Sequence, residues 1–124
     1  MGLQDTQAGF NVVGLLLRCH RLQKELAASA GLSVEEFHCL NQLYIHAPCC
    51  VKNLCEFTGI HPTRASKLLN VLETKGYVLR ASNSEDRRKE SLTLTQAGIG
   101  VARSLVESCA LSAQTLANSL SAEA

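Results

Sequence analysis

Large aromatic side chains are scarce in this sequence: among 124 residues there are two Tyr, three Phe and no Trp. Aliphatic residues supply most of the 46% apolar content, and 19% of the residues are charged. This balance is typical of a globular chain, and a core without large rings favours helices packed by aliphatic side chains. A chain of this length can bury one core, so we expect one mostly α-helical domain over residues 1–124.

The sequence also lacks a long hydrophobic run. The longest largely apolar stretch near the N-terminus covers residues 8–17 and ends at Arg18, which makes it too short to cross a membrane. The first residues show neither the basic start nor the small-residue cleavage site of a secretory signal peptide. We therefore expect a cytoplasmic protein with no membrane partner.

Six cysteines are present, but their spacing does not indicate a disulfide scaffold or a metal site. Cys19, Cys39 and Cys109 occur singly within helical patterns, and without a signal peptide we expect reduced thiols. The pairs Cys19–His20 and His38–Cys39 lack the C-x-x-C or H-x-x-x-H spacing of zinc ligands. We therefore expect no metal and no cofactor.

The net charge is only +1, but the charge is unevenly distributed along the chain. Residues 51–98 carry eight Lys or Arg against five Asp or Glu, whereas each flanking segment has a small acidic excess. Six consecutive charged residues, Glu85 to Glu90, lie within this middle segment. Such a run is often a solvated loop, so its structural context decides whether it forms a binding surface.

Helical periodicity occupies both ends of the chain. Apolar residues recur at spacings of three and four over residues 4–28 and again over residues 96–120, which predicts a long helix in each segment. Ser33 and Glu36 have the spacing of a capping box, so a further helix is predicted over residues 34–46.

The middle segment has the pattern of a helix-turn-helix. A short helix is predicted from Val51, and Gly59 marks the turn that ends it. Pro62 opens a second helix, for which Gly76 provides the stop. Two helices joined this closely form a helix-turn-helix.

A β-hairpin is predicted directly after this helix pair. Residues 77–81 are strand-like, and residues 90–95 alternate with period two. We interpret the polar residues 82–89 as the loop between the two strands. A helix-turn-helix followed by a hairpin is a winged helix, so the predicted fold class is mainly α (α+β), with a long helix on either side.

The predicted hairpin contains two short motifs, D-x-R from Asp86 and L-T-x-x-G from Leu94. Their spacing is similar to the wing signature of the MarR (multiple antibiotic resistance regulator) family of winged-helix transcription regulators. The helix-turn-helix over residues 54–77 resembles that family as well. One departure is Cys55, which occupies a position that is usually small and often alanine in the family.

The resemblance implies a division of labour within the chain. Residues 33–98 would form the DNA-binding winged-helix unit, and residues 1–32 and 99–124 would form dimerisation helices. It implies a homodimer on double-stranded DNA, which we interpret as a repressor on a pseudo-palindromic operator. The alternative is a winged helix used only for protein contacts. Nothing marks a nucleophile, base and oxyanion hole, so we do not expect an enzyme.

The second helix of the helix-turn-helix has two different faces. Its apolar residues can pack inward: Ala65, Leu68, Leu69 and Leu72. Its polar residues suit base edges and phosphates in a major groove: Thr63, Arg64, Ser66, Lys67 and Asn70. The charged run adds Arg87, Arg88 and Lys89, which can reach phosphates or the minor groove. The resemblance implies that Asp86 orients Arg88.

The resemblance also implies control by a small ligand or by a thiol oxidant. A ligand would occupy a crevice between the dimerisation helices and the winged-helix unit. The predicted apolar lining, which fits a plain core equally well, is Leu16, Leu40, Leu43 and Tyr44. The candidate redox residues are Cys49 and Cys50, because they lie beside a helix start, where a thiolate is favoured.

Overall fold

The computed structural model describes residues 3–83 and 86–123, and it describes side-chain surroundings for residues 11–82, 90–115, 117 and 118. The elements, in chain order, are α1 (Leu3–Ser29), α2 (Val34–His46), α3 (Val51–Thr58), α4 (Pro62–Thr74), β1 (Val78–Asn83), β2 (Asp86–Leu94) and α5 (Gln96–Glu123). This order confirms the predicted mainly α winged helix-turn-helix.

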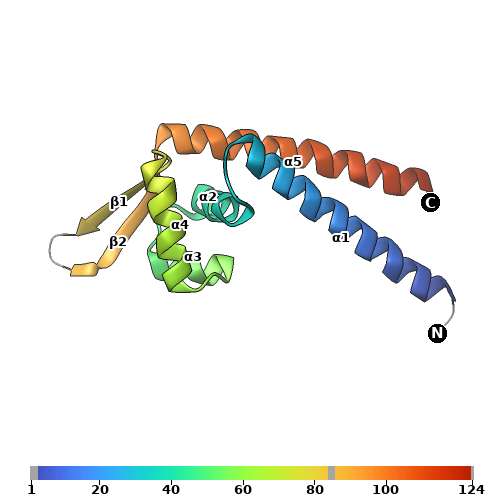
Figure 1. Cartoon of the computed structure of the whole chain (residues 1–124), viewed down its shortest axis with the longest axis horizontal. Coiled ribbons are helices and arrows are strands. Elements are labelled where there is room, and N and C mark those ends of the chain that lie inside the picture. Colours follow the sequence, from blue (N-terminus) through green and yellow to red (C-terminus); the bar gives the residue numbers. More distant parts are fainter. Residues whose placement is uncertain (1–2, 84–85, 124) are drawn as a thin grey trace.

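The elements form two regions of different shape (Figure 1). Helices α2, α3 and α4 pack together, and the β1–β2 hairpin extends from them as the wing. Helices α1 and α5 leave this winged-helix unit on the same side, so both chain ends lie at the far end of the molecule.

Local signals explain where the helices of this unit begin and end. The Ser33 side chain accepts a hydrogen bond from the Glu36 N–H, and the Glu36 side chain accepts one from the Ser33 N–H. This capping box begins α2, as predicted. Helix α3 ends at Gly59 with φ +73°, which an L side chain rarely adopts, and α4 begins with Pro62 at its first position.

The hairpin is longer than the sequence pattern predicts. The strands pair in antiparallel register, with Val78 opposite Leu94, Arg80 opposite Leu92 and Asn83 opposite Asp86. The prediction of a polar loop over residues 82–89 is therefore wrong, because β2 already begins at Asp86. Pairing uses backbone N–H and C=O groups, so a charged run can continue a strand that hydrophobic alternation does not reveal.

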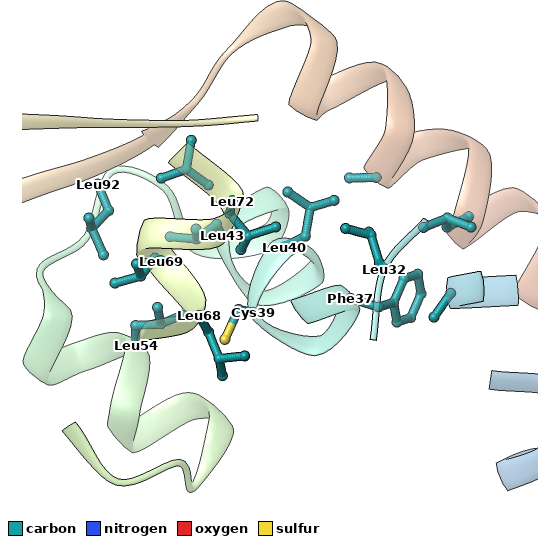
Figure 2. Packing of buried hydrophobic residues seen from close by; sticks show 14 of the residues in the cluster. Leu32, Phe37, Cys39, Leu40, Leu43, Leu54, Leu68, Leu69, Leu72 and Leu92 are labelled. Atoms are coloured by element: carbon teal, nitrogen blue, oxygen red, sulfur yellow. The ribbon is translucent and has the colours of Figure 1, made fainter. Parts of the chain in front are cut away.

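The core lies where α4 meets α2 (Figure 2). Its fully buried leucines come from four elements: Leu40 and Leu43 of α2, Leu54 of α3, Leu69 and Leu72 of α4, and Leu92 of β2. Cys39 and Val78 are also fully buried, and Phe37 is the one aromatic ring among the buried residues described. The predicted inward face of α4 is confirmed, since all four of its residues are buried.

The start of α5 is joined tightly to the end of α4. Thr95 Oγ1 donates a hydrogen bond to the Gly76 carbonyl at 2.6 Å and accepts one from the Gly98 N–H at 3.0 Å. A Cβ added at Gly98 would lie 2.1 Å from the Tyr77 carbonyl oxygen. The L-T-x-x-G motif therefore caps α5 and lets that helix approach the backbone that enters the wing.

The long helices leave apolar side chains on the surface of the single chain. Val12, Val13, Leu16 and Leu17 of α1, and Leu111 of α5, are each more than half exposed. The predicted apolar positions of α5 are Ala102, Leu105, Cys109, Ala113, Leu116 and Leu120. Among those whose side chains are described, Ala102 and Leu105 are buried, Cys109 is half-buried and Ala113 is exposed. The side chains of Leu116 and Leu120 lie outside the described residues.

The approach at Gly98 generates a stability prediction. We expect Gly98→Ala to lower the free energy of unfolding by about 2 kcal/mol or more, because the new methyl group forces the backbone apart. Gly100→Ala is the matched control on the same helix, where an added Cβ meets nothing within 4 Å. It should be neutral or stabilise by up to about 1 kcal/mol. Urea denaturation followed by circular dichroism measures both, and equal effects would refute the packing argument.

Candidate nucleic-acid interface

The outer face of α4 presents the polar residues that the sequence analysis selected for DNA contact. All five are exposed: Thr63, Arg64, Ser66, Lys67 and Asn70. The opposite face of the helix is buried in the core, so the helix cannot rotate without losing its packing. This geometry suits a helix placed in a major groove, which is about 12 Å wide.

The side chains of two of these five residues make hydrogen bonds within the chain. Arg64 donates a hydrogen bond from Nε to Oε2 of Glu35 on α2 at 2.7 Å, and a second from Nη2 to Oε1. This two-pronged contact lowers the pKa of the Glu35 carboxyl and raises the pKa of Arg64. The pair is solvent-exposed, so water and salt weaken it, and Arg64 can exchange Glu35 for a phosphate at low cost.

The second engaged residue is Asn70, and its partner was missed by the sequence analysis. Arg80 of β1 donates from Nη2 to Asn70 Oδ1 at 3.2 Å and to the Ser66 carbonyl at 3.3 Å. Its guanidinium also pairs with Glu73 of α4, at 3.3 Å, and with Glu90 of β2, at 4.0 Å. In the sequence, a lone arginine in a strand-like stretch gives no signal of these partners.

His61 begins α4 as its N-cap rather than as a free side chain. Its Nδ1 accepts a hydrogen bond from the Thr63 N–H at 3.2 Å. This contact satisfies one of the unpaired N–H groups at the helix start. His61 therefore has a local structural role at the start of α4. It was not among the predicted DNA-binding residues.

The wing tip carries the remaining predicted DNA contacts. Asp86, Arg87, Arg88 and Lys89 are the first residues of β2, which places their backbone at the end of the hairpin farthest from the core. Their side chains lie outside the described residues. The predicted support of Arg88 by Asp86 therefore stays a prediction.

A pocket of about 590 Å³ lies between α2, β2 and the start of α5. Leu43, Tyr44, Ile99 and Arg103 are among the residues that line it. Arg103 Nε donates a weak hydrogen bond to the Tyr44 hydroxyl at 3.4 Å. This size is within the usual range of small-molecule sites.

The four predicted crevice residues do not come together in the structure. Leu43 and Tyr44 line the pocket, but Leu40 is fully buried in the core and Leu16 is 62% exposed on α1. Leu16 and Leu40 therefore do not line this pocket, and a ligand crevice at these residues stays a prediction. Helical periodicity shows that a residue is on an apolar face, but it does not show what that face contacts.

The six thiols are free, and their surroundings differ. Cys49 is buried and pairs through its backbone with Leu92, and burial raises the pKa of its thiol. Burial likewise raises the pKa of Cys39 to about 12. Cys50 is the N-cap of α3, with its Sγ accepting from the Asn53 N–H at 3.5 Å. Burial therefore works against a thiolate at Cys49, and the predicted redox role of Cys50 stays a prediction.

Within residues 3–83 and 86–123, no helix is long and apolar enough to cross a membrane. In the same part of the chain, no three His, Cys, Asp or Glu side chains gather closely enough to hold a metal ion.

Two comparisons with known proteins match the winged-helix unit. The model of the MarR family matches residues 30–89. Over 68 residues the chain is 32% identical to the uncharacterized HTH-type transcriptional regulator YwhA of Bacillus subtilis (strain 168). These matches identify residues 30–89 as a winged-helix unit of the MarR type. The match to YwhA covers 55% of this chain and 49% of YwhA, so the chain spans about half the length of that curated relative.

Solved structures support the same fold across most of the chain. The MepR–DNA complex of Staphylococcus aureus superposes with a TM-score of 0.76 at 19% identity, over 90% of this chain and 82% of MepR. Wild-type MarR of Escherichia coli, in its apo form, gives 0.68 at 20% identity, over 86% of this chain and 76% of MarR. At these identities the likeness shows the winged-helix fold with its flanking helices.

The contrast among the thiols yields a reactivity prediction. During a short exposure of the folded protein to iodoacetamide at pH 8, we expect Cys50 to be alkylated well before Cys39 and Cys49. Burial keeps those two thiols protonated and inaccessible, and the thiolate is the reacting form. Peptide mass spectrometry measures each site, and the same reaction in urea is the control, because unfolding should equalise the rates. Equal labelling of Cys39 and Cys50 in the folded protein would contradict the described burial.

Proposed function

We propose that this protein is a sequence-specific DNA-binding regulator of transcription that acts as a repressor. The observation that carries the proposal is the two-faced helix α4, whose leucine face is buried while all five polar candidates are exposed beside the wing. A solved relative of the same fold, MepR, is bound to DNA. By analogy, α4 would read base edges in a major groove.

The wing would provide the second contact with DNA. Arg87, Arg88 and Lys89 lie at the tip of the hairpin, on the same unit as α4. Cations at such a tip can neutralise phosphates or enter the minor groove, where the negative potential is strongest. In this arrangement α4 supplies sequence preference and the wing supplies affinity for any duplex.

We further propose that the protein binds DNA as a homodimer. The exposed apolar residues of α1 and α5 lie on the two helices that extend away from the winged-helix unit (Figure 1). Burying them against a second copy would remove apolar surface from water. Residues 1–32 and 99–124 would then form the dimerisation part and residues 33–98 the DNA-binding part. A two-fold dimer predicts a pseudo-palindromic operator with half-sites roughly 10 bp apart.

Release from DNA would follow the binding of a small molecule in the pocket lined by Leu43 and Tyr44. That pocket touches α2 and β2 of the winged-helix unit as well as α5, so its occupant would contact both parts of the chain. A ligand changes affinity for DNA only if it binds the two arrangements of these parts unequally. Oxidation of Cys50 is the other route to release, because Cys50 is the one member of the predicted redox pair that is partly exposed.

The division between wing and helix can be tested by substitution. We expect Arg88→Ala to weaken binding to all duplexes and to reduce the salt slope by about one unit, as the loss of one phosphate contact does. Ser66→Ala should instead change the preferred base at particular operator positions. Selection from a random duplex pool, followed by salt titration of the winning sequence, measures both effects. An Arg88→Ala protein with unchanged affinity and slope would show that the wing does not contact DNA.

The proposed dimer can be tested without DNA. We expect the double substitution Leu16→Glu and Leu17→Glu to convert a dimer to a monomer at micromolar concentration, because four buried charges per interface would be uncompensated. Leu79→Glu, on an exposed leucine of β1, is the matched control and should stay dimeric. Sedimentation velocity measures the three proteins. A wild-type monomer at this concentration would refute the homodimer.

A further inference from the structure

Arg80 lies between the wing and the helix that faces the DNA. It belongs to β1, and its side chain is only 19% exposed. Its contacts on α4 are the Ser66 carbonyl, the Asn70 side chain and the Glu73 carboxylate, which follow one another along one side of that helix. A planar guanidinium with five N–H groups in a fixed geometry suits such a set of acceptors.

The charge of Arg80 is compensated within the chain. Its Nε lies 3.3 Å from Oε2 of Glu73, as an ion pair without hydrogen-bond geometry, and its Nη1 lies 4.0 Å from Oε2 of Glu90. A cation that is mostly buried and flanked by two carboxylates is poorly placed to bind a phosphate. The role of Arg80 is therefore to hold other residues in place.

The contact with Asn70 determines how that side chain is oriented. An asparagine amide has one end that accepts hydrogen bonds and one that donates them. Because arginine can only donate, the oxygen Oδ1 must be the end that faces Arg80, at 3.2 Å. The Nδ2 group, with its two N–H donors, makes no hydrogen bond within the described residues, and Asn70 is exposed on the outer face of α4.

This orientation affects which bases Asn70 can recognise. A free asparagine pairs with adenine through both ends, accepting from N6 and donating to N7. With Oδ1 held toward Arg80, the donating Nδ2 end is the one left to face a base. In the major groove guanine presents acceptors at N7 and O6, and thymine presents one at O4, whereas cytosine presents only a donor. Adenine presents an acceptor at N7, but its N6 donor lies beside it and finds no acceptor on an amide whose Oδ1 is turned toward Arg80.

We propose that Arg80 is a positioning residue that fixes the Asn70 amide as a hydrogen-bond donor toward DNA. Asn70 then selects guanine or thymine at one operator position and rejects cytosine. This inference rests on the proposed DNA binding, and it adds the chemical class of base that one residue of α4 recognises.

The test is selection from a random duplex pool by the full-length protein and four variants. Asn70→Ala identifies the operator position that Asn70 reads, as the one where base preference is lost. At that position we expect the wild-type protein to favour guanine or thymine over cytosine by about fivefold or more, the lower end of the cost of one mismatched base pair. We expect Arg80→Lys, which keeps the charge but frees the amide to rotate, to favour adenine there.

Two further variants separate positioning from general stability. Glu73→Gln removes an ion-pair partner of Arg80 without touching Asn70, and its base preference should match that of the wild type. Asn70→Asp keeps an acceptor for Arg80 but has no donor, so it should lose the preference for guanine or thymine and favour cytosine. This last variant tests the inference even if Arg80→Lys fails to fold, which circular dichroism would reveal. A purely structural role of Arg80 would lower affinity for all sequences equally.

The possible failures can be told apart. A wild-type preference for adenine or cytosine at the Asn70 position would overturn the inference, as would an Arg80→Lys protein that folds and keeps the wild-type preference. An Asn70→Ala protein with no altered position would overturn it as well. If the wild-type protein enriches no sequence at all, the proposed function itself fails, and the inference fails with it.

Discussion

The packing of α4 against α2 is the contact on which the rest of the structure depends. Leu69 and Leu72 are fully buried beside Leu40 and Leu43, and Leu92 of the wing closes the same cluster (Figure 2). Each buried leucine contributes about 2 kcal/mol, and truncating one to alanine costs about 2–5 kcal/mol. This apolar contact fixes the rotation of α4 about its axis, and so the direction of its polar residues.

Polar contacts then hold the neighbouring elements at fixed positions around α4. Lys75 Nζ donates to the Gly31 carbonyl at 2.5 Å and pairs with Glu36 at 3.6 Å, which ties the end of α4 to the start of α2. Arg80 joins α4 to the wing, and Thr95 joins the start of α5 to the turn that follows α4. Each of these contacts is modest in water. Together they make the helix and the hairpin one surface of defined shape, which a rigid duplex requires of its partner.

The two long helices, α1 and α5, differ from the winged-helix unit because their apolar faces extend beyond the core. Among the described side chains of α5, the buried ones lie in its first half, and more than half of the surface of Leu16 and Leu17 on α1 is exposed. The winged-helix unit buries its leucine face within the chain, whereas these faces of the long helices are incompletely covered. The proposed homodimer would cover them.

The sequence by itself determined the elements and the faces of the winged-helix unit. A capping box sets the start of α2, and a proline at the first position sets the start of α4. Gly59 and Gly76 follow the ends of α3 and α4. The buried face of α4 follows from leucine spacing. Local hydrogen bonding and periodicity carry this information.

Only the tertiary structure decided the partners of particular side chains. Arg64 pairs with Glu35 across 29 residues, and Arg80 meets Asn70 across ten, although neither spacing has a sequence signature. The same holds for the early start of β2 at Asp86, the burial of Cys49, and the separation of Leu16 and Leu40 from the pocket that Leu43 and Tyr44 line. These features depend on which surfaces meet after the leucine core has formed, and residues distant in sequence become neighbours only then.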